Sequence, residues 1–173
     1  PALGYILFTE ESEQDELPLN QTGLQAVIEN LTDGSLLRFI QTANRGFAEE
    51  FLLSRNIAGE SDITIFTRTG QLVAGSNRGY LFMIRKREVI APLPADHWNG
   101  SAIASYMNEL CSMAGYRLSV LSSLKADELE KVDELGVVND KEGFRWILAL
   151  GKKRYYRKGS VELAEALNLL LKT

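Results

Sequence analysis

Apolar and polar residues alternate along two adjacent parts of the chain, and this pattern predicts two β-hairpins. One lies in residues 61–76, around Thr69-Gly70, and the other in residues 78–94, around Arg85 to Arg87. Alternation of this kind is typical of half-buried strands, and a short polar or glycine-containing break between two such runs predicts a tight turn. We expect the two hairpins to form one antiparallel meander.

Apolar residues recur at helical spacing in other segments. This spacing predicts helices over residues 24–31 and 36–56, and a further helix over residues 99–116 that Asn99 or Ser101 caps and Gly115 ends. Ile103, Met107, Leu110, Cys111 and Ala114 form its inward face. Further strands are expected at residues 4–8, 134–140 and 144–150. Residues 117–133 are expected to form a strand, a short turn and a small helix, and residues 159–173 a terminal helix. The fold class is therefore α+β, with a mostly antiparallel sheet flanked by helices.

Composition limits the functional classes. The chain has 173 residues, 45% hydrophobic and 24% charged, with a net charge of -4, as expected of a soluble globular protein. The single Cys111 cannot form an internal disulfide, which favours a cytoplasmic location, and no apolar run approaches the roughly 20 residues that span a bilayer. With one His and one Cys, a tetrahedral zinc site is not expected.

Several charged segments allow a functional or a structural interpretation. The basic segment 152–158 interleaves Tyr155 and Tyr156 and could bind nucleic acid, but a solvated hairpin is favoured because the chain is acidic overall. The acidic residues 10–16 could dock onto a basic partner or stay solvated. His97 is expected to be structural, and four acids are expected on the polar face of a short helix and its turn: Asp127, Glu128, Asp133 and Glu134.

Three long segments, in the correct order, carry a resemblance to a known family. Residues 43–82 resemble a helix, a strand and a turn written T-E-G-S-x-S-N-x-F; residues 87–118 resemble a G-I-T-R segment before a helix; residues 124–150 resemble L-x-x-A-D-E-x-x-x-T-N-S-x-x-G-x-x-P-V. These are motifs of the class IV aminotransferases, the fold-type IV pyridoxal-phosphate enzymes that include aminodeoxychorismate lyase and D-amino acid aminotransferase. The resemblance implies their large-domain fold, a homodimer, and a helix N-terminus that holds the cofactor phosphate.

The positions that carry the family's chemistry depart from the motifs. The Schiff-base lysine falls on Leu37 or Arg38, and no lysine precedes Lys86. Arginine stays protonated and cannot replace it. The acid that pairs with the pyridine nitrogen falls on Ala74 or Gly75, with one residue inserted in the turn.

Further departures concern the phosphate site and the domain organisation. The threonine of G-I-T reads Ala102, and Val138 replaces the Thr or Ser before Asn139. Residues 1–35, with their acidic loop, stand in place of the family's small domain, and residues 36–173 match the large domain.

The sequence therefore predicts a degenerate, non-catalytic member of this fold, a pseudoenzyme that acts as a binding or interaction protein and a homodimer. No catalytic residue and no cofactor are expected, although pyridoxal phosphate or another small anion could still occupy a residual pocket. The resemblance assigns that pocket to Gly75, Ser76, Asn77, Arg78, Gly100, Ser101 and Asn139. The alternatives are an active pyridoxal-phosphate lyase or aminotransferase, and a polyanion binder that uses residues 152–158.

Overall fold

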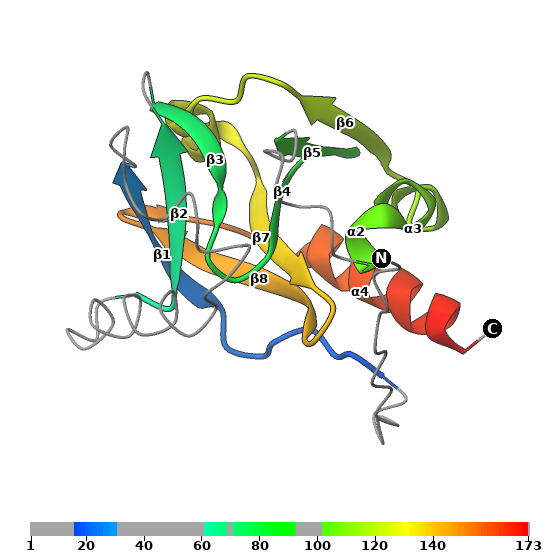
Figure 1. Cartoon of the computed structure of the whole chain (residues 1–173). Coiled ribbons are helices and arrows are strands. Elements are labelled where there is room, and N and C mark those ends of the chain that lie inside the picture. Colours follow the sequence, from blue (N-terminus) through cyan, green and yellow to red (C-terminus); the bar gives the residue numbers. More distant parts are fainter. Residues whose placement is uncertain (1–15, 31–60, 69–70, 93–101, 173) are drawn as a thin grey trace, which may run out of the picture.

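The computed structural model describes residues 16–30, 61–68, 71–92 and 102–172 (Figure 1). The predicted strand at residues 4–8, the predicted helix at 36–56 and His97 lie outside these ranges. The strands are β1 (Leu24–Asn30), β2 (Ile63–Arg68), β3 (Leu72–Ser76), β4 (Tyr80–Arg85), β5 (Glu88–Pro92), β6 (Arg117–Leu121), β7 (Glu134–Asn139), β8 (Gly143–Leu150) and β9 (Lys153–Arg154). The helices are α2 (Ala102–Ser105), α3 (Met107–Met113), the 3₁₀ helix η3 (Ala126–Lys131) and α4 (Lys158–Leu171).

The strands form one mixed, curled sheet. Its order is β3-β2-β1-β8-β7-β4-β5-β6, and β9 pairs with β8. β1 runs parallel to both β2 and β8, β5 runs parallel to β6, and the other pairs are antiparallel. The predicted α+β class is confirmed, with a sheet flanked by a few helices.

Both predicted hairpins exist, but they do not form one meander. β2 pairs with β3, and β4 pairs with β5 around the turn after Arg85. Between β3 and β4, however, the sheet order places β2, β1, β8 and β7. The prediction was wrong because β4 pairs with β7, a strand more than fifty residues later, and local patterning carries no information about such a pairing.

The predicted helix at residues 24–31 is the strand β1. Its residues pair on both sides, with Ile63 to Thr67 of β2 and with Ile147 to Leu150 of β8. Two parallel neighbours satisfy the backbone N–H and C=O groups, and the buried Ala26 fits this central position. β1 thus shares its sheet with later strands. The proposed domain boundary near residue 35 falls outside the described ranges and stays a prediction.

The sheet buries side chains on both faces, which explains the continuous apolar run of β4. Tyr80, Phe82 and Ile84 pack against the side that α2, α3 and α4 cover, whereas Leu81 and Met83 point into the concave interior. On the helix side, the ring of Phe82 meets that of Phe144 edge-on, with centroids 5.5 Å apart. Figure 1 shows the three helices gathered on one side of the curl.

The helical segment that follows residue 101 is interrupted once. α2 and α3 are separated at Tyr106, and their predicted inward residues Ile103, Met107, Leu110 and Cys111 are buried. Gly115 ends α3 with a φ of 75°, as predicted. Burial raises the pKa of the Cys111 thiol to about 11, so the thiol is not readily ionised at neutral pH.

Glu134 corrects the prediction for the four acids. Instead of lying on a polar face, its side chain is buried, with 5% of the residue's surface exposed. Its carboxylate accepts hydrogen bonds from the N–H groups of Gly159 (2.7 Å) and Ser160 (2.9 Å) and from the Ser160 hydroxyl (3.0 Å). The first turn of α4 is thereby bonded to the first residue of β7.

Candidate functional site

Four of the predicted pocket residues lie in or beside the turn between β3 and β4. Asn77 and Arg78 belong to the turn, and Gly75 and Ser76 end β3. The Ser76 hydroxyl donates to the carbonyl of Gly79 at 2.9 Å. The Asn77 N–H donates to the Thr64 carbonyl at 3.1 Å, and the Asn77 side-chain oxygen accepts the Thr64 N–H at 2.9 Å. Asn77 therefore extends the hydrogen bonding of β2, and its amide oxygen serves the fold.

Next to this turn, Ala74 and Gly75 occupy the place where the resemblance puts an acid. Phe66 pairs with Gly75 and Thr67 pairs with Val73, so Ala74 is the additional residue of a β-bulge. Gly75 has a φ of 147°, in the range that favours glycine.

Asn139, at the end of β7, is bonded to the turn between β3 and β4. Its side-chain nitrogen donates to the carbonyl of Arg78 at 2.9 Å. Its side-chain oxygen accepts the N–H groups of Lys141 (3.0 Å) and Glu142 (2.8 Å) and so shapes the turn into β8. The structure therefore brings Arg78 and Asn139 together, whereas Gly100 and Ser101 lie outside the described residues.

Asp140 is the site residue that the sequence analysis missed. Its Oδ2 accepts the N–H of Ala102 at 3.0 Å and its Oδ1 accepts the N–H of Ile103 at 2.9 Å. The chain thus supplies a carboxylate to the helix start that the resemblance assigns to a phosphate. One sequence signal was present: aligned on T-N-S-x-x-G, residues 138–143 read V-N-D-K-E-G, with Asp140 in place of the serine.

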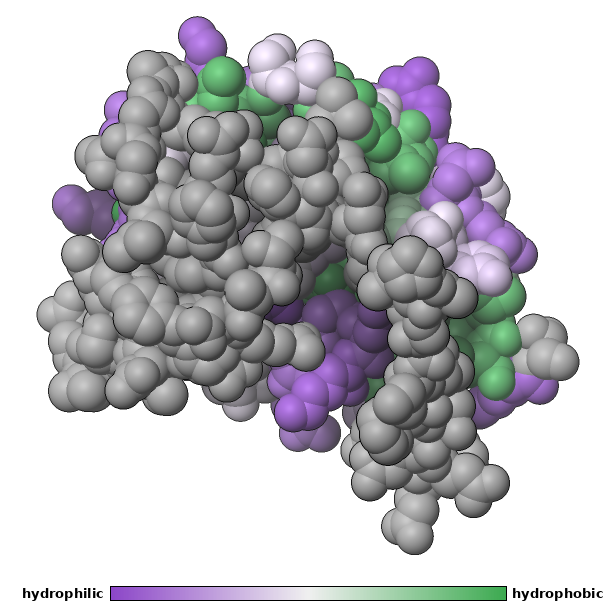
Figure 2. Space-filling model, viewed as in Figure 1, coloured by the Kyte–Doolittle hydropathy of each residue, from purple (hydrophilic) through white to green (hydrophobic). Residues whose placement is uncertain are grey.

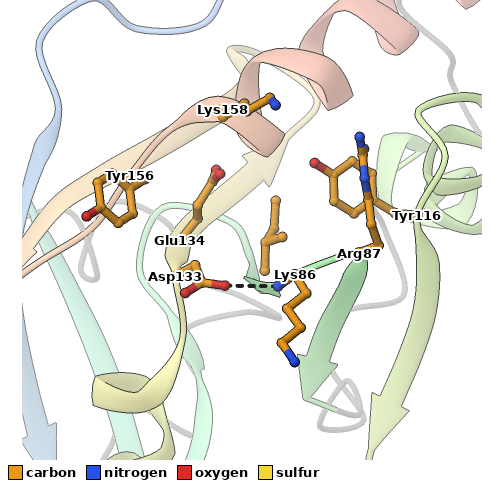
Figure 3. Close-up of a pocket in the computed structure, with 8 residues that line it drawn as sticks. Lys86, Arg87, Tyr116, Asp133, Glu134, Tyr156 and Lys158 are labelled. Atoms are coloured by element: carbon orange, nitrogen blue, oxygen red, sulfur yellow. Dashed lines mark hydrogen bonds between the residues drawn. The ribbon is translucent and has the colours of Figure 1, made fainter.

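A separate cavity of about 330 Å³ lies at the opposite end of β4 (Figure 3). Its polar side chains largely satisfy each other or the backbone. Asp133 accepts the Lys86 N–H at 2.9 Å, and Glu162 accepts the Tyr116 hydroxyl at 2.7 Å and pairs with Arg87 at 2.9 Å. Burial and the hydrogen bond to Glu162 raise the pKa of Tyr116, while that hydrogen bond and Arg87 lower the pKa of Glu162.

In Figure 3, the labelled ends of Lys86 and Lys158 point away from each other. These two lysines therefore do not converge on an anionic ligand, and Arg87 is paired with Glu162. Among the described residues, no group of three or more His, Cys, Asp and Glu could hold a metal ion. No helix in this part of the chain has the length and apolar character that crossing a membrane requires.

The basic segment 152–158 forms the predicted hairpin, since β9 pairs with β8. Tyr155 is buried and its hydroxyl donates to the carbonyl of Leu129 at 2.9 Å, while the Arg157 guanidinium lies over the Trp146 ring. Tyr156 is 76% exposed. Of the two interleaved tyrosines, only Tyr156 could stack on a base, which weakens the polyanion interpretation.

Comparison with solved structures gives the fold. The chain resembles a candidate 4-amino-4-deoxychorismate lyase from Legionella pneumophila (TM-score 0.70, 17% identity, 89% of this chain and 57% of the other). It also resembles an aminotransferase from Brucella abortus bound to pyridoxal phosphate (0.70, 17%, 92% and 57%) and a branched-chain aminotransferase from Thermoproteus uzoniensis (0.70, 15%, 89% and 53%).

The described fold is thus that of a domain of the fold-type IV pyridoxal-phosphate enzymes. The chain spans little more than half the length of these structures. No family model and no curated protein matches it by sequence.

Proposed function

We propose that this chain is a non-catalytic relative of the class IV aminotransferases that acts as a binding or interaction protein. The observation that carries the proposal is the missing lysine. The first lysine of the chain is Lys86, in the turn between β4 and β5, at the opposite end of β4 from the turn that contains Asn77 and Arg78. Schiff-base chemistry requires a lysine that can lose its proton beside the cofactor, and arginine does not supply one.

The hydrogen bonds of the candidate site support this proposal. The side-chain oxygens of Asn77 and Asn139 are both bonded to backbone N–H groups of the scaffold. The N–H groups of Ala102 and Ile103 are bonded to Asp140. Together with Ala74 or Gly75 at the place of the acid, these residues do not fit pyridoxal phosphate. Loss of both the nucleophile and the acid would remove covalent attachment and the electron sink.

Covalent capture tests the proposal. The protein is titrated with pyridoxal phosphate, reduced with borohydride, and digested for peptide mass spectrometry. We expect low, unsaturable labelling spread over exposed lysines. Saturable labelling of one lysine would contradict the proposal and support the alternative, an active lyase or aminotransferase.

Lys141 is the lysine to examine, because it adjoins Asp140 in the turn after β7. Lys141→Arg keeps the charge and removes the nucleophile, and Lys125→Arg is the matched control at another exposed lysine. An active enzyme that uses Lys141 would lose its adduct in the first variant only.

We further propose a cytoplasmic homodimer. The motif resemblance, which implies a dimeric family, and three exposed apolar side chains on α3 and α4 support the dimer: Met113, Leu169 and Leu171. Figure 2 shows hydrophobic residues reaching the surface on the side where these helices lie. The single, buried Cys111 is compatible with a reducing compartment. Light scattering after size exclusion tests the assembly, and a mass of one 19.3 kDa chain at micromolar concentration would contradict it.

A further inference from the structure

The carboxylate of Asp140 engages the two backbone donors at the start of α2, with one oxygen on each. The Ala102 N–H bonds to Oδ2 and the Ile103 N–H bonds to Oδ1. We propose that Asp140 is this chain's internal substitute for a ligand phosphate, and that the start of α2 therefore excludes phosphate groups. The inference rests on the proposed function and names the residue that closes the inherited phosphate position.

The turn around Asp140 holds the carboxylate in this place. Asn139 accepts the N–H groups of Lys141 and Glu142 on one side and donates to the Arg78 carbonyl on the other. Asp140 is the residue between these bonds, in a turn that links β7 to β8. These bonds fix the backbone at Asp140. To vacate the helix start, its side chain would have to give up its two hydrogen bonds to Ala102 and Ile103.

Electrostatics gives the direction of the effect. A phosphate that bound the N–H groups of Ala102 and Ile103 would displace one anion and stand beside it, and the two negative charges would repel each other. A second carboxylate stands in the same turn, where Glu142 accepts a hydrogen bond from the side-chain nitrogen of Asn139 at 3.3 Å. Serine at the place of Asp140 would be neutral and could donate a hydrogen bond, whereas an ionised carboxylate only accepts. The substitution therefore reverses the preference of this position for an anion.

Titration with inorganic phosphate tests the inference, with the backbone amide resonances of Ala102 and Ile103 as the readout. In the unmodified protein we expect no saturable shift of these resonances. In Asp140→Ser we expect saturable shifts centred on these two resonances. The affinity for phosphate should be at least about tenfold higher than the upper limit that the unmodified protein sets. Asp133→Ser is the matched control, because Asp133 also accepts a backbone N–H, from Lys86, just before the other end of β7. This variant makes the same change in charge and should behave as the unmodified protein does.

The outcomes separate the two proposals. Saturable phosphate shifts at Ala102 and Ile103 in the unmodified protein would overturn the inference, and so would equal behaviour of Asp140→Ser and the unmodified protein. If Asp140→Ser does not fold, Asp140→Asn carries the test, since it keeps one oxygen acceptor without the charge and should also bind phosphate more tightly. A single reduced lysine adduct with pyridoxal phosphate would instead overturn the proposed function.

Discussion

Glu134 joins the start of strand β7 to the start of helix α4. Its carboxylate accepts three hydrogen bonds from Gly159 and Ser160 at the start of α4, and the side chain is almost fully buried. We therefore predict that Glu134→Ala is among the more destabilising single substitutions outside the apolar core.

The magnitude follows from the groups left without a partner. Glu134→Ala leaves two N–H groups and the Ser160 hydroxyl without their acceptor. An unsatisfied buried donor costs about 1–3 kcal/mol, and water that enters the vacated volume would recover part of this. We expect a loss of about 3 kcal/mol. Glu134→Gln retains one acceptor oxygen but places an amide N–H₂ against a backbone donor, so we expect about 1.5 kcal/mol.

Urea unfolding followed by circular dichroism measures both values, with an unchanged m-value as the check on two-state behaviour. Glu130→Ala is the matched control, because Glu130 is an exposed glutamate in η3. It should change the free energy of unfolding by less than about 0.5 kcal/mol. A loss below about 1 kcal/mol for Glu134→Ala would refute the reasoning, since it would mean that α4 does not depend on this cap.

Three further predictions concern the candidate site and the helix side of the core. Asn139→Ala removes the bonds to the turn before β8 and to the Arg78 carbonyl and should cost about 2 kcal/mol in urea unfolding. Gly79→Ala should cost at least about 2 kcal/mol, because φ is 153° and the new Cβ would clash with the Val138 carbonyl oxygen. Cys111 should react with a disulfide reagent at pH 8 only as the chain unfolds. Its pKa is about 11 in the folded state and lower in the unfolded state, so its contribution to stability should fall as the pH rises from about 9 towards 11. Fast labelling without denaturant would contradict this.

Local patterning was sufficient for most elements but not for the order of the strands. The hairpin β4–β5 and the inward face of Ile103, Met107 and Leu110 followed directly from periodicity. Periodicity did not identify β1 as a strand, because an eight-residue segment with apolar residues at 24, 27 and 28 fits one face of a helix as well as a strand. The choice is made by its two parallel neighbours, which are distant in sequence.

The prediction of the candidate site met the same limit, because local patterns carry no information about contacts between residues distant in sequence. The motifs brought Arg78 and Asn139 into one pocket, and the structure joins them by a hydrogen bond. Asp140 and Glu134 were not recognised, because each acts on backbone groups 25 or more residues away in sequence. A carboxylate in a polar turn has the same local signature whether it is solvated or caps a distant helix.

The motif positions that this chain keeps and those it loses differ in what the fold requires of them. Asn77 closes the hydrogen bonding of β2, and Asn139 shapes the turn before β8. Each would be retained for stability alone, so its presence is no argument for a bound cofactor. Under the proposed function, the positions that only pyridoxal phosphate chemistry needs, the lysine and the acid, would carry residues that cannot perform that chemistry. This division is what the proposed non-catalytic function expects, and a single saturable lysine adduct with pyridoxal phosphate would contradict it.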